Sequence, residues 1–152
     1  MGFPKLFYTI SAKLSWRNLV RSQGSPVYDD LVARFLNSKS QFAVSTGRIR
    51  SSVFLPSPQD LKLSVFEMIG LFPAEIWRLG TRHVGRPSGK TVQARADLTP
   101  QAIAAARLTL DRDGNPRRHC SATGWIDDKE DQKERALILA DQARLQVRRQ
   151  GS

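Results

Sequence analysis

The stretch TVQARADLTPQAIAAARLTL, residues 91–110, contains the elements that decide the fold. Apolar and polar residues alternate from 91 to 96, which predicts a strand with one buried face. Thr99 can then cap a helix, and Pro100 suits the first helical position because its missing N–H needs no partner there. Alternation returns at 108–110 and predicts another strand. A strand, a short helix and a strand in succession predict a protein that mixes α and β structure.

The preceding part of the chain extends this pattern. The run from Ile49 to Leu55 predicts one strand, and alternating apolar residues predict another at 62–68. Pro73 opens a helix that we expect to run to about Val84, where Gly85 and Pro87 should end it. The segment 29–37 is apolar but too short for its pattern to separate helix from strand.

The last element is predicted as a long helix from Asp128 to about Arg148, with acids in its first turns and arginines in its last. Ile138 and Leu145 fall opposite its main apolar stripe, one heptad apart. Scattered exposed apolar side chains need no explanation, but a pair at this spacing can meet a partner helix. Ile138 and Leu145 are therefore predicted contacts for a protein partner.

These elements predict an α+β fold, with a small mixed or antiparallel sheet, about three to four helices and a long C-terminal helix. The chain has 152 residues, of which 40% are hydrophobic and 25% charged, and this composition suits a single compact domain. We place this domain at 27–149 and expect residues 1–26 to form a basic N-terminal arm or helix. Cys120 is the only cysteine, and no apolar run could span a bilayer, so we expect a cytoplasmic protein.

Charge is the strongest functional indication in the sequence. The net charge is +10, and the two windows 1–28 and 76–96 contain no Asp or Glu. Positive charge distributed so unevenly predicts an anionic partner, either nucleic acid or another polyanion. The predicted contacts are Lys13, Arg17, Arg21, Arg78, Arg82, Arg86, Lys90, Arg95 and Arg117.

The polar cluster Arg117–Trp125 supports a different interpretation. Its arginine pair could hold a phosphate while His119 exchanges a proton near neutral pH. Positive charge on either side would also lower the pKa of Cys120 and favour its thiolate. In the alternative without catalysis, His119 and Cys120 pack beneath Trp125 and the arginines face solvent.

The catalytic interpretation is a small metal-independent enzyme, ribonuclease-like or nucleotide-acting, in which His119 and Arg118 are catalytic. It needs a second acid or base, and His83 is expected to be a core histidine because it lies on the apolar stripe of the helix that begins at Pro73. Two histidines and one cysteine in this spacing match no zinc pattern, so we expect no metal and no cofactor. The sequence favours a binding protein over an enzyme but does not decide between them.

Short sequence words over residues 34–147 resemble a group of short, functionally uncharacterised bacterial proteins. The words are Arg34-Phe35-Leu36, Phe54-Leu55-Pro56, Ser64-Val65-Phe66, Gly70-Leu71, Glu75-Ile76-Trp77, Ala94-Arg95-Ala96-Asp97, Arg118-His119, Gly124-Trp125, Asp128-Lys129 and Gln132-Lys133. The group implies no function. This chain departs from its pattern at Cys120, where a small apolar residue is expected, and at Ile126, where a proline is expected.

We therefore predict first a basic accessory module that binds nucleic acid or another polyanion, such as one belonging to a bacterial mobile-element or defence locus. The second prediction is the enzyme described above. The third is an accessory subunit that contacts another protein through Ile138 and Leu145. No pattern in the sequence indicates an oligomeric state.

Overall fold

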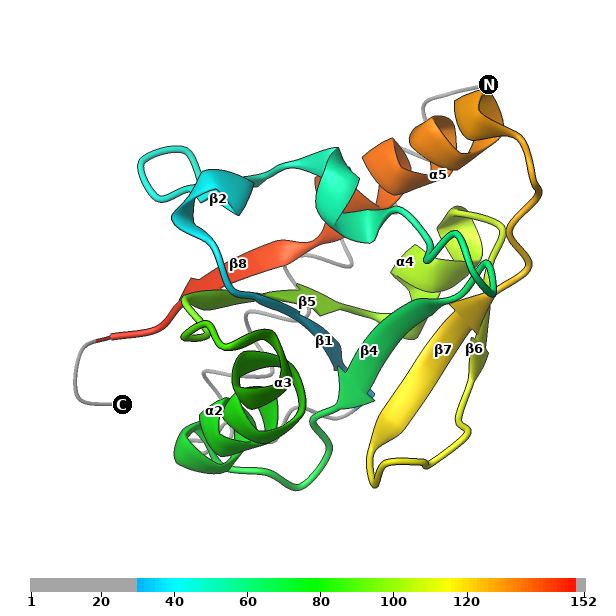
Figure 1. The fold of residues 1–152 in the computed structure, drawn as a ribbon. Coiled ribbons are helices and arrows are strands. Elements are labelled where there is room, and N and C mark those ends of the chain that lie inside the picture. Colours follow the sequence, from blue (N-terminus) through cyan, green and yellow to red (C-terminus); the bar gives the residue numbers. More distant parts are fainter. Residues whose placement is uncertain (1–29, 150–152) are drawn as a thin grey trace.

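The computed structural model describes residues 30–149. The predicted arm at 1–26, with the predicted contacts Lys13, Arg17 and Arg21, lies outside the described residues. The described chain forms one α+β domain in which an antiparallel six-stranded sheet is packed with helices, as predicted (Figure 1).

The large sheet has the strand order β6-β7-β4-β1-β5-β8, and every neighbouring pair is antiparallel. A separate two-stranded sheet joins β2 to β3. The strands are β1 (Val32–Leu36), β2 (Phe42–Ala43), β3 (Arg48–Ile49), β4 (Leu63–Glu67), β5 (Ala94–Leu98), β6 (Thr109–Asp111), β7 (His119–Thr123) and β8 (Arg144–Val147).

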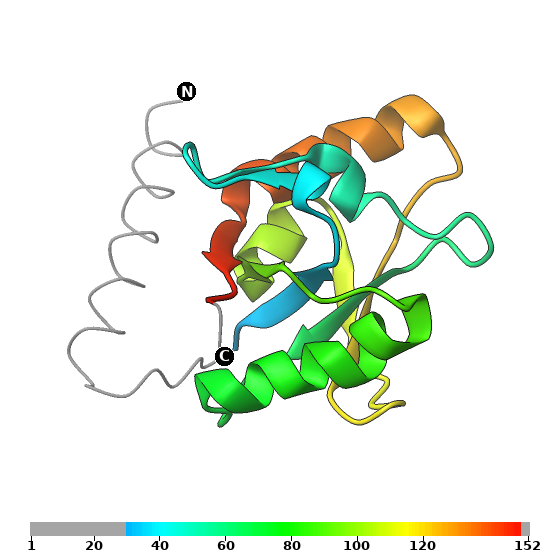
Figure 2. The ribbon, with the colours of Figure 1, turned by 60° about the vertical axis from the view of Figure 1, so that its left-hand side comes forward.

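The helical segments cover the two faces of the large sheet. They are the 3₁₀ turns η1 (Lys39–Gln41) and η2 (Ser51–Phe54), helix α2 (Pro73–Gly80), the π-helical turn η3 (Thr81–Gly85), and helices α3 (Arg86–Ser88), α4 (Pro100–Ala105) and α5 (Lys129–Gln142). One face packs against η2, α4 and α5, and the other against the continuous rod formed by α2, η3 and α3 (Figures 1 and 2). Strands β7 and β6 extend beyond this rod in Figure 1.

Several local predictions are confirmed. The Thr99 hydroxyl accepts a hydrogen bond from the Ala102 N–H at 3.1 Å and caps α4, with Pro100 in its first turn. The predicted strand at 62–68 contains β4, the one at 108–110 overlaps β6, and the ambiguous segment 29–37 contains the central strand β1. These elements form as predicted because their capping and alternation are properties of adjacent residues.

One predicted element type and one predicted helix end are wrong. The segment 49–55 is not one strand, because β3 ends at Ile49 and η2 follows. Val53 and Phe54 are adjacent and both buried, and a turn can bury consecutive side chains on one side where a strand would separate them. The helical segment from Pro73 does not end at Gly85 or Pro87, because η3 and α3 continue it to Ser88 with Pro87 inside α3.

The last helix is shorter than predicted. Helix α5 begins after Asp128, whose carboxylate accepts from the Glu130 N–H at 3.1 Å, and ends at Gln142. The residues that follow form β8, which pairs with β5 from Asp97↔Arg144 to Ala94↔Val147. Pairing with the open edge of β5 satisfies backbone groups there, and this long-range gain is greater than the local preference for helix.

Helix α2 lies unusually close to the sheet at Gly80. A Cβ at this position would lie 2.5 Å from Cδ1 of Phe35, a buried residue of β1. The absence of a side chain therefore allows the helix to pack directly on the Phe35 ring.

We expect Gly80→Ala to lower the free energy of unfolding by about 1–3 kcal/mol, because the methyl group overpacks this contact. Urea denaturation measures the loss. Phe35→Leu in the same chain removes the ring and should recover part of it. Equal losses for Gly80→Ala with and without Phe35→Leu would contradict this packing.

Strand β5 is buried on both faces, and its polar residues are buried with it. The Arg95 Nε donates to Oδ1 of Asp97 at 2.9 Å, and their side chains are 2% and 1% exposed. The Arg95 guanidinium also lies 4.9 Å from the ring centroid of Trp77 in α2. The prediction that Arg95 contacts a nucleic acid is therefore wrong, because this side chain is inside the domain.

Burial raises the pKa of Asp97 from 3.8 to about 6, although the Arg95 charge and hydrogen bond act in the opposite direction. Among residues 30–149, the buried Oδ2 of Asp97 has no hydrogen-bond partner, which helps to explain why the charged form is disfavoured. The folded state thus binds a proton more tightly than the unfolded state does. Asp97 consequently costs stability at neutral pH, and this cost disappears as the pH falls below 3.8.

We expect the stability of the wild type relative to Asp97→Asn to fall by roughly 3 kcal/mol as the pH rises through the window from 3.8 to about 6. The Asn side chain does not titrate, so the difference between the two proteins isolates Asp97. Urea unfolding of both proteins at a series of pH values measures it. Parallel stability curves would show that the pKa of Asp97 is the same in the folded and unfolded states.

Candidate functional site

A row of arginines lies along the outer side of the α2–η3–α3 rod. Arg78, Arg82 and Arg86 are exposed and follow one another at four-residue spacing, a rise of about 6 Å per step. Lys90 follows after Gly89, whose left-handed conformation (φ 69°) ends α3. The structure therefore brings four of the predicted basic contacts onto one element and its exit turn.

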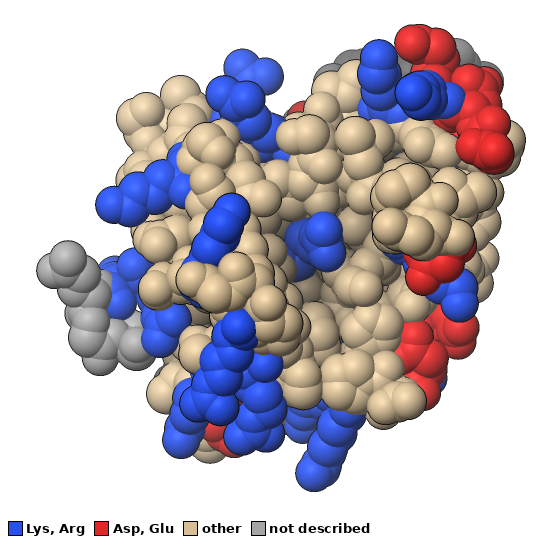
Figure 3. Space-filling model, viewed as in Figure 1, with Lys and Arg blue, Asp and Glu red and all other residues tan. Residues whose placement is uncertain are grey.

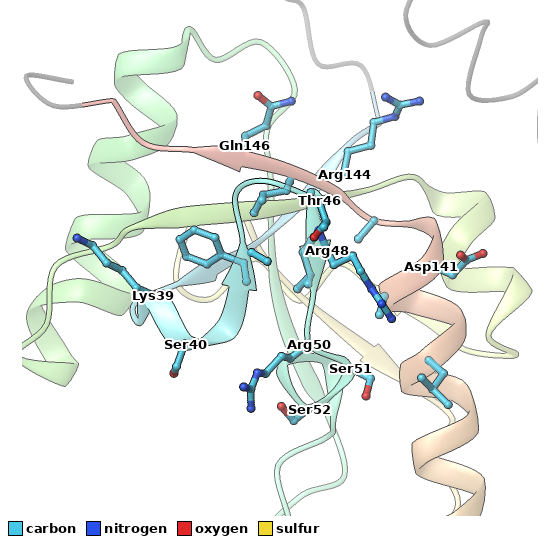
Figure 4. A pocket seen from close by; sticks show the side chains of 18 residues that line it. Lys39, Ser40, Thr46, Arg48, Arg50, Ser51, Ser52, Asp141, Arg144 and Gln146 are labelled. Carbon is cyan, nitrogen blue, oxygen red and sulfur yellow. The ribbon is translucent and has the colours of Figure 1, made fainter.

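A basic groove lies between the β2–β3 hairpin and the C-terminal end of α5 (Figure 4). Its volume is about 1280 Å³. The charged residues lining it are Lys39, Arg48, Arg50, Asp141 and Arg144. Figure 4 shows the Arg48 side chain pointing into the space between the hairpin and α5, with Lys39 and Arg50 at the margin.

The arginine row and the groove are joined. The Asn37 side-chain amide donates to the Ser88 hydroxyl at 3.3 Å, so the end of α3 contacts the segment that leads into Lys39. We call the combined area the basic surface. It comprises Arg78, Arg82, Arg86, Lys90, Lys39, Arg48 and Arg50.

Positive and negative charges are separated on the molecule. In Figure 3, Lys and Arg gather over the rod and the hairpin at the left, whereas most of the acids lie at the right, near the start of α5. Within residues 30–149, no cation of the basic surface is in an ion pair. On the acidic side, by contrast, Asp131 pairs with Arg135 at 2.7 Å and with Arg107 at 3.5 Å. Within the described residues, the positive field over the basic surface is therefore not compensated by ion pairs.

Lys39, Arg48 and Arg50 were missed by sequence reasoning. They lie outside the acid-free windows on which the charge prediction was based. The spacing of Arg48 and Arg50 could have indicated a shared basic face, because the side chains of residues two apart in an extended segment point the same way. The remaining predicted contact, Arg117, is exposed in the turn before β7.

A separate polar cluster forms where β4 and β7 pair. Phe66 lies opposite His119 and Ser64 lies opposite Ser121, so all four side chains are on one face of the sheet. The His119 ring joins two other side chains: Nδ1 lies 2.6 Å from Oδ1 of Asp113, and Nε2 lies 3.1 Å from the Ser64 hydroxyl. We call this arrangement the Ser64–His119–Asp113 cluster.

Asp113 anchors the cluster from the loop between β6 and β7. Its second carboxylate oxygen accepts a hydrogen bond from the Ser121 hydroxyl at 2.8 Å, and Oδ1 also accepts from the Asn115 N–H. Desolvation opposes ionisation of Asp113, but the hydrogen bonds from His119, Ser121 and Asn115 outweigh it and lower the pKa of this carboxyl. Asp113 is therefore an anion that can orient an imidazole.

His83 lies near this cluster rather than deep in the core. It is half-buried, and its ring stacks on Phe66 at a centroid distance of 5.4 Å while His119 contacts the same ring edge-on at 5.3 Å. Burial, followed by the charges of Arg82 and His119, lowers the pKa of His83. The prediction that His83 is a core histidine is therefore only partly correct. One face of its ring packs on Phe66, but the residue is half-buried.

Neither predicted environment is fully correct: Cys120 packs in the core with Trp125, as the alternative without catalysis predicted, but His119 does not. Cys120 is fully buried in the core cluster that contains Trp125, while His119 projects from the opposite face of β7. Burial, followed by the nearby Glu67 carboxylate, raises the pKa of the Cys120 thiol to about 12. The flanking arginines cannot favour the thiolate: Arg118 is held by a hydrogen bond from Nη1 to the Ile69 carbonyl at 2.7 Å.

Ile138 and Leu145 do not share a helix face. Ile138 lies in α5 and Leu145 in β8, and both are half-buried against the core. Leu137, which is 59% exposed, is the large apolar residue that α5 presents to solvent. The helical spacing behind the predicted protein contact is therefore absent.

No protein-family model, curated protein or solved structure matches this chain. No helix among residues 30–149 combines the length and apolar character needed to cross a bilayer.

We expect Cys120 to resist alkylation in the folded protein. Iodoacetamide at pH 8 should modify it at a negligible rate, because the thiol is buried and remains protonated. The same reagent in 8 M urea should label it completely, and mass spectrometry distinguishes the two outcomes. Rapid labelling without denaturant would mean that this part of β7 opens readily or that the thiol is ionised.

Proposed function

We propose that this protein binds nucleic acid through the basic surface. The single observation that carries the proposal is the continuity of uncompensated cations from the rod to the groove, across the contact of Asn37 with Ser88. The surface is divided between the arginine row on the rod and the adjoining groove.

Guanidinium groups suit this partner because each can donate two parallel hydrogen bonds to a phosphate. Arg78, Arg82 and Arg86 supply three such groups at four-residue spacing, so the helical backbone sets the spacing of their Cα atoms before binding. Contacts to phosphate position a nucleic acid without reading its bases. We therefore expect binding with little sequence preference and a strong dependence on salt.

The ribonuclease-like alternative has less support. Arg118 is turned toward the Ile69 carbonyl rather than toward His119. No cation of the basic surface, within residues 30–149, forms a hydrogen bond with a side chain of the Ser64–His119–Asp113 cluster. An enzyme that cleaves RNA would need a phosphate-binding cation beside its base.

We expect the triple variant Arg78→Ala/Arg82→Ala/Arg86→Ala to bind nucleic acid more weakly and with a shallower salt dependence. Each lost phosphate contact should reduce the slope of log affinity against log salt by about 0.9 on a duplex. Fluorescence anisotropy with a labelled duplex and a labelled single strand, at several salt concentrations, measures both quantities. The effect should be similar for different base sequences.

The matched control is Arg107→Ala/Lys129→Ala/Lys133→Ala. It removes the same charge from the acidic side near the start of α5, where Arg107 and Lys133 already have carboxylate partners. It should leave the salt slope unchanged. Equal losses in the two triple variants would mean that only net charge matters, and undetectable binding by the wild type at low salt would overturn the proposal.

A double variant, Arg48→Ala/Arg50→Ala, tests whether the groove belongs to the same surface. We expect a further reduction of the salt slope when it is combined with the substitutions on the rod, because the two areas contact successive phosphates of one strand. A double variant indistinguishable from the wild type would confine the interface to the rod.

A further inference from the structure

The Ser64–His119–Asp113 cluster has the connectivity of an activated nucleophile. A carboxylate contacts one ring nitrogen of an imidazole, and the other ring nitrogen contacts a hydroxyl, at 2.6 Å and 3.1 Å respectively. This order of carboxylate, imidazole and hydroxyl is what general-base activation of a serine requires. The three residues come from β4, β7 and the loop before β7, so the arrangement does not follow from any local motif.

The carboxylate decides which ring nitrogen carries the proton. Oδ1 of Asp113 can only accept, so Nδ1 of the neutral His119 ring carries the hydrogen and donates it. Nε2 then presents its lone pair to the Ser64 O–H, which donates to it. The ring is thus held in the tautomer that can withdraw the serine proton.

The three side chains differ in how far they are exposed to solvent. His119 is 15% exposed and Asp113 31% exposed, while Ser64 is an exposed residue at the surface of the sheet. The Ser64 backbone is itself fixed, because Arg34 donates from Nη1 to its carbonyl at 3.0 Å and from Nε to the Val53 carbonyl. A hydroxyl that is accessible, paired with a shielded base and held on a rigid strand is suited to attack an incoming group.

We propose that Ser64 is the nucleophile of an acyl-transfer site whose substrate is a carboxylic ester or another activated acyl group, with His119 as the general base. Ser64 Oγ forms a bond to the acyl carbon, and its proton passes to Nε2 of His119. The bond from the acyl carbon to the leaving alkoxide breaks, and the alkoxide takes the proton from His119. Water, deprotonated by His119, then attacks the acyl group, releases the carboxylic acid and restores the serine.

Asp113 is a positioning residue in this site, because it acts through His119 and not on the substrate. This inference is independent of nucleic-acid binding, since the basic surface contributes no residue to the cluster. His83 borders the site across Phe66, and within the described residues its ring nitrogens form no hydrogen bond with the protein. It is therefore the nearest unengaged polar group for an incoming substrate.

Labelling with diisopropyl fluorophosphate tests the proposal without knowledge of the natural substrate. In this reaction Ser64 Oγ bonds to phosphorus, fluoride leaves and His119 takes the proton. The full chain should be modified once, and peptide mass spectrometry should place the adduct on Ser64. Exposed Ser52 and Ser88 are internal controls, because neither has an imidazole partner in the described structure.

Substitutions test the role of each residue of the cluster in the labelling reaction. Ser64→Ala should abolish the adduct, and His119→Ala should slow its formation by about 100-fold or more. Asp113→Asn should slow it by about tenfold or more with little change in melting temperature, and Asp113→Glu should restore part of the rate. Ser121→Ala removes the hydrogen bond from the Ser121 hydroxyl to Asp113 and should have a much smaller effect.

The outcome is decisive in either direction. A Ser64 adduct that depends on His119 supports the proposal, as does a burst of p-nitrophenol from p-nitrophenyl acetate that disappears in Ser64→Ala. Labelling of Ser64 no faster than that of Ser52 and Ser88, or labelling unaffected by His119→Ala, would overturn it. Neither result bears on the salt-dependent binding of nucleic acid, which depends on other residues.

Discussion

The structure depends on covering the central strands β1 and β5 on both faces. Every residue of β5 is buried, and β1 is buried except at the half-buried Arg34. One cover is formed by η2, α4 and α5 and the other by the α2–η3–α3 rod, which approaches β1 closely because Gly80 has no side chain. Burial of apolar surface on both sides is the main stabilising contribution in such a layered domain.

The same constraint explains where polar groups are found. Arg95 and Asp97 lie on the face of β5 that the rod covers. They are therefore paired with each other, and Arg95 lies against Trp77 of α2. Beyond the rod, strand β7 carries His119 on the same face, and there the side chain remains near solvent. A polar cluster inside the sandwich is therefore structural, whereas one at the margin of the rod is accessible to a ligand.

The rod carries part of the basic surface and borders the Ser64–His119–Asp113 cluster. Arg82 and His83 are consecutive, yet Arg82 is exposed in the basic row and His83 stacks on Phe66 beside the cluster. Burial, followed by the charge of Arg82, lowers the pKa of His83.

The sequence by itself determined the elements whose causes are local: the Thr99–Pro100 helix start, the alternating strand around Val65, the acids that open α5 and the arginines of the rod. Only the tertiary structure decided the rest. The end of α5 depends on an open edge of β5, the burial of Arg95 depends on a second covering layer, and the hydrogen bond between His119 and Ser64 joins residues 55 positions apart. Periodicity and capping record interactions between neighbours in the chain, but strand pairing and desolvation are set by residues far away in sequence, and no local pattern specifies them.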